Sequence, residues 1–590
     1  MTTDAPLAAQ QDRWQQALVA NAGDAQAWYR LGQLASEAGQ LAVAQDYLHQ
    51  ALALNPQFDE ARLALGQLAE QAGAWPEAVG QYQQILAGNP RQAEALLRLA
   101  VIFYRVGRYP EARSLLATVL TLTPAHAEAH RYWGLLLKQQ GDLAAAEASF
   151  RQAVALAPTS AAAQHNLAVA IAAQGQLVEA LTHFNQALAL DPNFAQAAYN
   201  RAVALKMLKD HAGAGAAFQQ AIALRPEQTQ WQFEAGLLLP PVVMDTADIA
   251  AHRSRLEQQL DRLSPGAINL TDWLNDSASN FEPPLELAYH GHNNRTLKEK
   301  FARLFRLEGV PPGEAVTSPS ATRPHLGFLV TRGHEKGFNQ FVAGLINHLS
   351  PAVGRISIIC PAASWPLIQP AITRPQVEVL AIPEQVPAAA AAIKQARLDL
   401  LYYWEVGTDP LNYFLPFFRS APVQCTSWGT PETTGLPALD YFLSSRLFEP
   451  EHAAAHYSEQ LVQLNGLGVY YERPNLKALT RTRLDFGFSP TEPLYLCTQN
   501  LVKFHPDFDL LLGQILRQSP RGRVLVKAKY APLNEALRQR WQTRLPDVAD
   551  RIEFIPQQSY EDYLNLIKVA DALLDTVHYS GGTTSFEAIA

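Results

Sequence analysis

Proline recurs every 34 residues through the first 228 residues of the chain. The prolines of this series are Pro56, Pro90, Pro124, Pro158, Pro192 and Pro226. When each proline is numbered 32 in its own unit, other positions of the unit align as well. Position 8 is always glycine or alanine, position 20 is always alanine, and position 24 is always a large apolar or aromatic residue. Position 15 is glycine in five units and Lys209 in the sixth. A period kept over so many copies requires a fold in which each unit packs against its neighbours.

Two helices joined by a turn account for these positions. Small residues at positions 8 and 20 let the helices approach closely, and the large residue at position 24 fills the space between units. Glycine at position 15 ends the first helix, and the proline ends the second. The pattern resembles the tetratricopeptide repeat. This resemblance implies an α superhelical solenoid of six repeats over residues 25–228, preceded by a helical leader over residues 1–24. It also implies a concave face that binds a protein or peptide.

Charge and cysteine content exclude several classes of function. The net charge is only −8 and no long run of lysine and arginine is present, so we expect no nucleic-acid partner. No stretch of about 18 uncharged apolar residues occurs, and we expect no membrane span. The first residues, MTTDAPLAAQQDRWQQ, lack a secretory signal pattern. Cys360, Cys425 and Cys497 match neither a disulfide framework nor metal-ligand spacing. We therefore expect a cytoplasmic protein in a reducing compartment.

Beyond Gln228 the period ends and the pattern changes twice. Residues 229–322 are predicted to form a helical linker region, interrupted at Pro240 and Pro241, with a proline-rich surface segment over residues 310–324. Residues 323–485 then alternate short apolar runs with helical stretches, which predicts parallel strands in a doubly wound α/β sheet. The predicted strands are residues 325–330, 355–360, 377–382, 398–404 and 422–428.

Three loops of this region follow strand ends and are expected to share one crevice, because ligands of doubly wound sheets bind there. They are residues 331–338, 404–410 and 428–435. The last loop belongs to the run SAPVQCTSWGTPETTGLPALDYFLSS, which is similar to the APVQ…W-G-x-P-x-T-T-G…DY segment of a bacterial branch of the protein O-GlcNAc transferase and Spindly family. The resemblance implies two Rossmann-like lobes in the GT-B arrangement, placed after tetratricopeptide repeats. Many relatives carry histidine or tyrosine where this chain has Thr430.

Residues 486–590 form the second predicted lobe, which is expected to bind a nucleotide sugar. Its predicted strands are residues 494–499, 523–528, 551–556 and 570–576. The segment TQNLVKFHP directly follows the first of them, and a lysine at this place can reach a diphosphate as a point charge. The segment resembles the family motif F-N-x-L-x-K-x-x-P. This implies that Lys503 contacts the donor diphosphate and that Asn500 assists.

The final segment, HYSGGTTSFEAIA, combines small residues with a helix start. Gly581 and Gly582 allow close backbone approach, and the following helix start offers free N–H groups to phosphate. Thr583 and Thr584 add hydroxyl donors, and Glu587 can accept hydrogen bonds from ribose hydroxyls. Preceded by ADALLDT, the segment resembles the family motif L-D-T/P…G-[HG]-T-T…[DE].

A third segment, IPQQSYEDYLNL, is the place where the family holds the nucleotide base. By alignment, the ring against the base is Tyr563 and the main-chain group that reads the base edge belongs to Gln558. No D-x-D motif and no clustered histidine and cysteine set is present, so we expect no metal site. The charge of the leaving group is then expected to be met by Lys503 and the helix start.

These motifs predict a metal-independent, inverting protein glycosyltransferase. The expected co-substrate is a nucleotide diphosphate sugar, with UDP preferred over GDP and GlcNAc preferred over fucose or glucose, and no further cofactor is expected. The expected acceptor is a Ser/Thr side chain of a protein. His334 is similar in position to a family histidine that lines the acceptor side, where it accepts a proton or orders the pocket. Relatives carry an asparagine ladder at repeat position 6, to which this chain contributes Asn166 and Asn200.

Two further expectations remain open. The alternative to an enzyme is a non-catalytic scaffold of tetratricopeptide repeats with a degenerate transferase region, and nucleotide binding distinguishes the two. The second lobe is also expected to be incomplete, because the chain stops at Ala590, about two turns into a helix whose start is expected to hold phosphate. Relatives continue from this helix into another apolar strand.

Overall fold

A computed structural model describes residues 4–276, 283–307, 323–471, 473 and 479–590. Most of the proline-rich segment predicted at residues 310–324 lies outside these residues. The chain divides into two compact units. The first comprises residues 1–204 and 223–225, and the second comprises residues 205–222 and 226–590. Among the described residues, no helix combines the length and the apolar character needed to cross a bilayer.

The repeat region consists of helix pairs, as the 34-residue period predicts. Helix α1 (Asp4–Ala20) precedes them. The pairs are α2 (Ala25–Glu37) with α3 (Leu41–Leu54), α4 (Asp59–Gln71) with α5 (Trp75–Gly88), α6 (Ala93–Arg105) with α7 (Tyr109–Leu122), α8 (Ala127–Gln139) with α9 (Leu143–Leu156), α10 (Ala161–Ala173) with α11 (Leu177–Leu190), and α12 (Ala195–Met207) with α13 (His211–Leu224).

The large residue at position 24 packs directly over position 8 of its own repeat. A Cβ atom added to Gly66 would lie 2.4 Å from the Tyr82 ring, and one added to Gly134 would lie 2.6 Å from the Phe150 ring. Both rings are fully buried. In these two repeats close helix packing therefore favours glycine at position 8, because a Cβ atom there would overlap the ring.

The glycine at position 15 serves a different purpose. Gly39 and Gly141 have φ angles of 72° and 82°, yet an added Cβ would meet nothing within 4 Å. The left-handed backbone, and not the available space, therefore favours glycine at the end of the first helix. Lys209, which breaks the glycine series, has a φ of 61° and keeps the same turn.

The first α/β sheet has seven parallel strands in the order β5-β4-β3-β6-β7-β8-β9. The strands are β3 (His325–Leu329), β4 (Arg355–Pro361), β5 (Val377–Ile382), β6 (Leu400–Tyr403), β7 (Val423–Ser427), β8 (Tyr441–Ser445) and β9 (Gln460–Leu464). The first five of these strands confirm the prediction to within two residues at either end. Strands β8 and β9 were not predicted.

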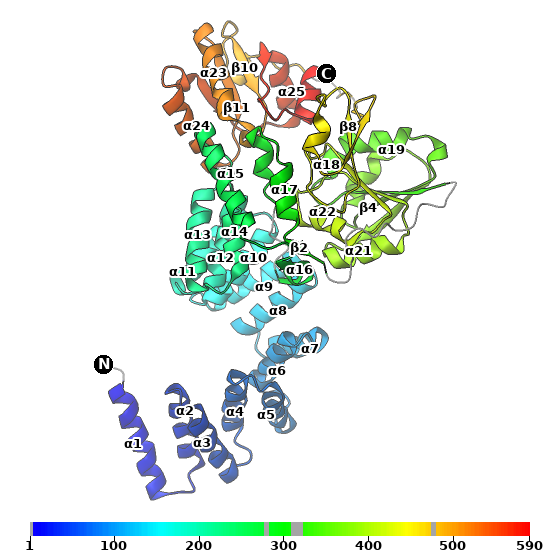
Figure 1. Ribbon diagram of the computed structural model, residues 1–590. Coiled ribbons are helices and arrows are strands. Elements are labelled where there is room, and N and C mark those ends of the chain that lie inside the picture. The colour runs from blue at the N-terminus through cyan, green and yellow to red at the C-terminus, as the bar shows by residue number, and fades with distance from the viewer. Residues whose placement is uncertain (1–3, 277–282, 308–322, 472, 474–478) are drawn as a thin grey trace. The chain divides into compact units, whose positions relative to one another are not determined.

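Helices cover both faces of this sheet, as a parallel sheet requires. Helices α18 (Glu335–Phe338), α19 (Gly344–His348) and α20 (Trp365–Ile368) pack on one face, where they share a core with the β4 side chains Ile356 and Ile358. Helices α21 (Val386–Gln395) and α22 (Pro410–Phe414) pack on the opposite face (Figure 1). The doubly wound fold is thus confirmed.

The second α/β sheet has four parallel strands in the order β12-β11-β10-β13. Its strands are β10 (Leu494–Cys497), β11 (Arg523–Lys527), β12 (Ile552–Ile555) and β13 (Ala572–Leu573). Helices α23 (Pro506–Gln518) and α24 (Ala531–Arg544) share a core with one face. Leu566 of α25 (Tyr560–Val569) packs on the other face. Helix α26 (Thr583–Ile589) follows the loop after β13.

The predicted linker region belongs to the core of the second unit. It forms α14 (Thr229–Gly236), α15 (Thr246–Asp261), α16 (Leu270–Asp276) and α17 (Arg295–Ala302), together with a two-residue parallel pair of β1 (Ile268–Asn269) and β2 (Phe305–Arg306). Helix α14 ends before Pro240 and Pro241, which confirms the predicted interruption. Apolar side chains of these helices join the core on the α21 and α22 face of the first sheet.

Candidate functional site

In both sheets of the second unit, strands are added first on one side of a starting strand and then on its other side, which creates a topological switch point. In the first sheet, β4 and β5 extend to one side of β3, and β6 to β9 extend to the other. In the second sheet, β11 and β12 extend to one side of β10, and β13 pairs on the other side. Loops that leave adjacent strands at such a point diverge and open a crevice at the carboxyl ends. The residues predicted from the sequence follow β3, β10 and β13.

Residues from both lobes line one cavity of about 1110 Å³. The first lobe contributes residues after β3, β6 and β7, and the second contributes residues after β10, β11 and β13. The segment from Ala288 to Asn294, which precedes α17, contributes a further part of the wall. Of the predicted donor residues, the cavity wall includes Asn500, Lys503, Gly581, Gly582, Thr583 and Thr584.

Lys503 lies where the loops after β10 and β13 meet. Its Nζ atom donates hydrogen bonds to the Gln499 side chain at 3.2 Å and to the Ser580 carbonyl oxygen at 3.0 Å. The ammonium group also lies 4.8 Å from the centre of the Tyr579 ring. Burial lowers the pKa of Lys503, while the Asp575 carboxylate acts in the opposite direction. The structure therefore holds a cation in the wall of the cavity.

The glycine pair is organised by Asp575, a residue to which the sequence had assigned no role. The Asp575 carboxylate accepts hydrogen bonds from the Gly581 N–H at 3.2 Å and from the Ser580 hydroxyl at 2.5 Å. A Cβ atom added to Gly581 would lie 2.2 Å from Gln499 Nε2, so a larger residue here would displace the Gln499 side chain. The same Gln499 amide donates to the Thr584 hydroxyl at 3.1 Å. Gln499 therefore connects the loop after β10, which holds Lys503, to the start of α26, which holds Thr584.

The second lobe adds polar groups to the cavity that sequence reasoning missed. Lys527, the last residue of β11, and Lys529, just after it, both line the cavity. Asn500 Oδ1 is buried and accepts no hydrogen bond from any residue that the structure describes. A buried acceptor without a partner favours a ligand that donates a hydrogen bond to it. Together with Lys503, these groups make the wall suitable for an anion that also carries hydroxyl or N–H groups.

Tyr563, Gln558 and Glu587 are absent from the cavity wall formed by the described residues, although Gln557 belongs to it. The buried Glu587 carboxylate accepts a hydrogen bond from Tyr560 at 2.9 Å. The rings of Tyr560 and Tyr563 lie with centroids 6.2 Å apart. Burial, followed by the nearby Glu587 carboxylate, raises the pKa of Tyr563. Gln558 donates its side-chain N–H to the Pro556 carbonyl oxygen. Base and ribose contacts of these residues stay predictions.

His334, at the start of α18, lies between two carboxylates of the loop after β6. Its Nδ1 atom is 2.6 Å from Glu405 and its Nε2 atom is 3.3 Å from Asp409. Burial alone would lower its pKa, but the hydrogen bonds with Asp409 and Glu405 raise the pKa to about 10. The ring is therefore protonated near neutral pH and has no free lone pair. Of the two roles predicted for His334, this arrangement favours ordering the pocket over accepting a proton.

The loop after β7, with sequence WGTPETTG, is held by contacts that were not evident from the sequence. The buried Glu459 carboxylate accepts hydrogen bonds from the hydroxyls of Thr433 and Thr434. A Cβ atom added to Gly429 would lie 2.2 Å from the Trp404 carbonyl oxygen, which brings this loop against the loop after β6. The three loops of the first lobe thus lie together, and the two threonines of the motif hold the loop in place.

The predicted acceptor residues lie on α10 and α12 in the repeat region. His165 Nδ1 is 3.3 Å from Asn166 Oδ1, and His165 Nε2 is 2.9 Å from Asn200 Nδ2. These partners fit a neutral ring that donates from Nδ1 and accepts at Nε2. Burial lowers the pKa of His165 to about 4, in agreement with a neutral ring. The two asparagines are therefore bridged by one imidazole, and acceptor binding by them stays a prediction.

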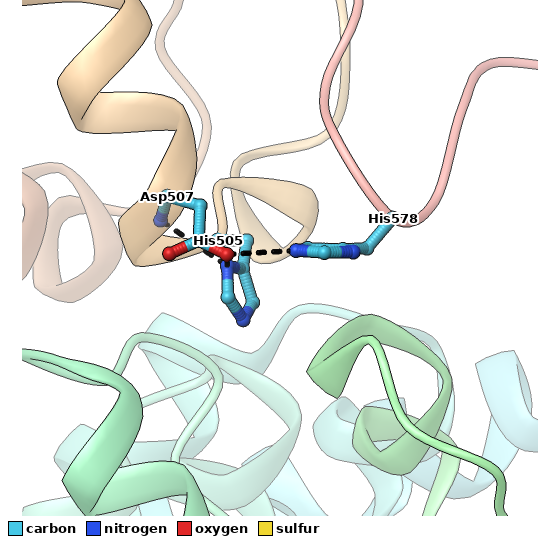
Figure 2. A group of neighbouring side chains, drawn as sticks. All are labelled: His505, Asp507 and His578. Carbon is cyan, nitrogen blue, oxygen red and sulfur yellow. Dashed lines mark hydrogen bonds and ion pairs between the residues drawn. The ribbon is translucent and has the colours of Figure 1, made fainter.

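A histidine and aspartate cluster also lies beside the cavity. His578 Nε2 is 2.9 Å from Asp507 Oδ2, and His505 Nδ1 is 3.3 Å from the same oxygen (Figure 2). No clustered ligand set was expected from the sequence, in which His578 stands 71 positions after Asp507. Parallel strands β10 and β13 bring these distant segments together.

Comparisons with known proteins agree with the repeat architecture. The family model described as tetratricopeptide repeat matches residues 29–93, 75–127, 97–161, 131–193 and 165–229. Among solved structures, a mutant O-GlcNAc transferase from Thermobaculum terrenum aligns over 84% of this chain and 80% of that chain, with 21% identity and a TM-score of 0.41.

Curated relatives are distant and are matched over a part of their length. A probable UDP-N-acetylglucosamine–peptide N-acetylglucosaminyltransferase, SPINDLY of Arabidopsis thaliana, is 29% identical over 206 residues, which are 34% of this chain and 22% of the relative. SPINDLY of Solanum lycopersicum is 30% identical over 182 residues, which are 29% of this chain and 18% of the relative. The protein SEC of Arabidopsis thaliana, named for the same activity, is 24% identical over 208 residues, 34% of this chain and 21% of the relative.

The match thus spans about a fifth of the length of these relatives. The resemblance expected from the sequence motifs is nevertheless confirmed. The chain has tetratricopeptide repeats over residues 29–229 and α/β sheets after them, and it is similar to the SPINDLY and SEC proteins over about a third of its length.

Proposed function

We propose that the chain is a protein glycosyltransferase that uses a nucleotide diphosphate sugar. The observation that carries the proposal is the position of Lys503, whose ammonium group stands at the switch point of the second sheet and in the wall of a large cavity. A cation at this place suits a diphosphate, and the cavity is large enough for a nucleotide sugar. SPINDLY and SEC are named as UDP-N-acetylglucosamine–peptide transferases, which supports a peptide acceptor and UDP-N-acetylglucosamine as the donor.

The proposed reaction is a direct displacement with inversion. The acceptor hydroxyl oxygen bonds to the anomeric carbon while the bond from that carbon to the diphosphate oxygen breaks, and the hydroxyl proton passes to a diphosphate oxygen or to water. Negative charge grows on the departing diphosphate, where Lys503 and the backbone N–H groups around Gly582 would meet it without a metal ion. Because this charge is larger in the transition state than in the bound donor, Lys503 would act mainly on the rate.

The other predicted residues take supporting roles in this proposal. Asn500 would donate or accept a hydrogen bond at the donor, and Thr583 and Thr584 would contact phosphate oxygens. Tyr563 and Gln558 would contact the base, and Glu587 the ribose. The protonated His334 would fix the carboxylate of Glu405, which lines the cavity on the first-lobe side. The solenoid, through Asn166 and Asn200, would bind the acceptor protein.

Nucleotide titration of the full chain tests the proposal. Calorimetry with UDP and with GDP should give one binding site, with tighter binding of UDP, and incubation with UDP-N-acetylglucosamine and a protein mixture should produce a hexosamine mass increase on serine or threonine. Binding of GDP alone would redirect the donor assignment to fucose-type sugars. Failure of both nucleotides to bind would overturn the proposal and favour the non-catalytic scaffold.

A further inference from the structure

The cluster of His505, Asp507 and His578 combines the ligand types that divalent transition metals prefer. Imidazole nitrogens together with one carboxylate oxygen form a donor set that suits zinc and related ions. One ligand atom from each of the three residues lies within 4.8 Å of the other two. Among the described residues, this is the one group of three that meets this criterion.

The distances within the cluster fit ligands of a single ion. With bonds of about 2.0 to 2.2 Å, two ligand atoms lie about 2.9 Å apart at a right angle and about 3.4 Å apart at a tetrahedral angle. The separation of 2.9 Å between His578 Nε2 and Asp507 Oδ2 falls in this range, and so does that of 3.3 Å between His505 Nδ1 and the same oxygen. The ligand atoms of His505 and His578 lie within 4.8 Å of each other, so the imidazoles would move closer to share an ion, and His505 Nδ1 would give up the hydrogen bond from the Asp507 N–H.

The backbone holds the three side chains in place from two directions. His505 is buried and caps the start of α23, where its Nδ1 atom accepts the Asp507 N–H at 3.2 Å. His578 has a φ of 66°, a backbone conformation rare for residues other than glycine. Its ring packs on Gly291, where an added Cβ would lie 2.8 Å from the ring. The imidazoles of His505 and His578 meet nearly at right angles, with centroids 4.4 Å apart.

We propose that His505, Asp507 and His578 bind a divalent transition-metal ion of the zinc class. The ion would replace the hydrogen bonds of Asp507 with the two histidines and would join the start of α23 to the loop after β13 (Figure 2). Three protein ligands leave at least one position of a four-coordinate ion for water or a further ligand. This loop carries Ser580, whose carbonyl oxygen accepts a hydrogen bond from Lys503. The role proposed for the ion is structural, and the inference does not depend on the proposed transferase activity.

The competing description is an ordinary hydrogen-bonded cluster without affinity for metal. In that description, His578 pairs with Asp507 as an exposed ion pair, and metal ions bind only weakly to scattered surface histidines. The two descriptions differ in stoichiometry and in their dependence on particular residues. One tightly bound ion whose binding requires both Asp507 and His578 is expected only if these residues form a specific metal site.

Metal titration of the full chain separates them. The chain is first freed of metal with a chelator, then titrated with Zn²⁺ by calorimetry and with Co²⁺ by visible absorption. We expect one equivalent of tight binding, Co²⁺ bands of a four- or five-coordinate ion, and a higher midpoint of thermal unfolding with Zn²⁺. Asp507→Asn and His578→Gln should each weaken binding by at least about 10- to 100-fold, as the loss of a ligand or its partner typically does.

Suitable controls are available in the same chain. His452 is exposed and lies outside the cluster, so His452→Gln should bind Zn²⁺ as the wild type does. His505 is buried, and its replacement risks unfolding, so the two more exposed ligands are replaced instead. Equal Zn²⁺ affinity of the wild type, Asp507→Asn and His578→Gln would overturn the proposal, as would the absence of tight binding by the wild type. Nucleotide affinity, measured on the same samples, reports separately on the transferase proposal.

Discussion

Lys503 is the residue whose replacement we expect to change transfer most directly. In Lys503→Ala, the departing diphosphate loses a charge-assisted contact, which typically lowers the rate by about 10² to 10³. The side chain is half-buried at a loop, so the fold should persist. Turnover of the nucleotide sugar in Lys503→Ala and wild type measures the effect. Lys394→Ala, at the end of α21 and outside the cavity, is a matched control that should leave the rate unchanged. A wild-type rate in Lys503→Ala would remove Lys503 from the mechanism.

The pKa of His334 makes a second prediction at the same scale. A histidine in the unfolded chain titrates near about 6.5, whereas the two carboxylates raise the pKa of His334 to about 10 in the folded chain. The stabilisation is therefore fully present below about pH 6.5 and is lost as pH rises toward 10. Between these values, the free energy of unfolding should fall by up to about 1.4 kcal/mol per pH unit relative to a variant that cannot titrate.

Thermal and denaturant unfolding of wild type and His334→Gln from pH 6 to 10 measures this difference. The free-energy gap between the two proteins should narrow as pH rises, because in this range the folded wild type holds a proton on His334 that its unfolded chain has lost. A gap that stays constant across this range would show that His334 is not held as an imidazolium.

Some residue contacts could be predicted from the sequence and others could not. Lys503 and the Gly581–Gly582 pair stand directly after strand ends, so the parallel-sheet pattern alone brings them to one edge. Glu405 and Glu459 are single carboxylates whose partners come from other segments, and no local pattern marks them. The His505, Asp507 and His578 cluster was missed for the same reason. Long-range contacts of this kind depend on how the strands pair, which the spacing of motifs does not determine.

At the scale of elements, burial of apolar runs decided which strands were predictable. Strands β3, β4 and β6 lie inside the first sheet and read as continuous apolar runs. Strand β9, with sequence QLVQL, lies at the edge of the sheet and is largely exposed, so it contains no such run. Strand β13 was expected over residues 570–576 but pairs only through Ala572 and Leu573. Strand β5, with sequence VEVLAI, lies at the opposite edge but keeps an apolar run and was predicted, so the apolar run decides and not the edge position.

The buried ion pair between α23 and α24 is expected to control the stability of the second lobe. Asp509 accepts hydrogen bonds from Arg540 at 2.9 Å and from Trp541 at 3.0 Å, and both charged side chains are completely buried. Asp509→Asn leaves the Arg540 charge without its partner. Breaking a buried pair in this way costs about 3 to 5 kcal/mol. The free energy of unfolding, measured by denaturant titration of the full chain, should fall by this order.

The same two segments provide a matched control. Arg517 of α23 pairs with Asp547, just after α24, through two hydrogen bonds of 2.7 and 2.8 Å, but both side chains are about half exposed. Solvent screens this pair, so Asp547→Asn should change the free energy of unfolding very little. Equal destabilisation by Asp547→Asn and Asp509→Asn would show that burial does not determine the strength of these pairs.

At the scale of the whole molecule, the residues proposed for donor binding and those proposed for acceptor binding belong to different compact units. The cavity and the residues proposed to bind the donor belong to the second unit, whereas Asn166 belongs to the first. A variant that begins at Ala195 keeps α12 and α13, parts of which belong to the second unit. We expect this variant to bind UDP as the full chain does, because every residue that lines the cavity is retained. We also expect it to lose transfer to intact proteins, because solenoids of stacked repeats typically supply an extended binding surface.

Calorimetry with UDP and mass spectrometry of an intact acceptor protein measure the two properties on one sample. Hydrolysis of the nucleotide sugar by water, which needs no acceptor protein, shows whether the chemistry itself survives. Undiminished modification of intact proteins by the shortened chain would show that the acceptor is recognised within the second unit.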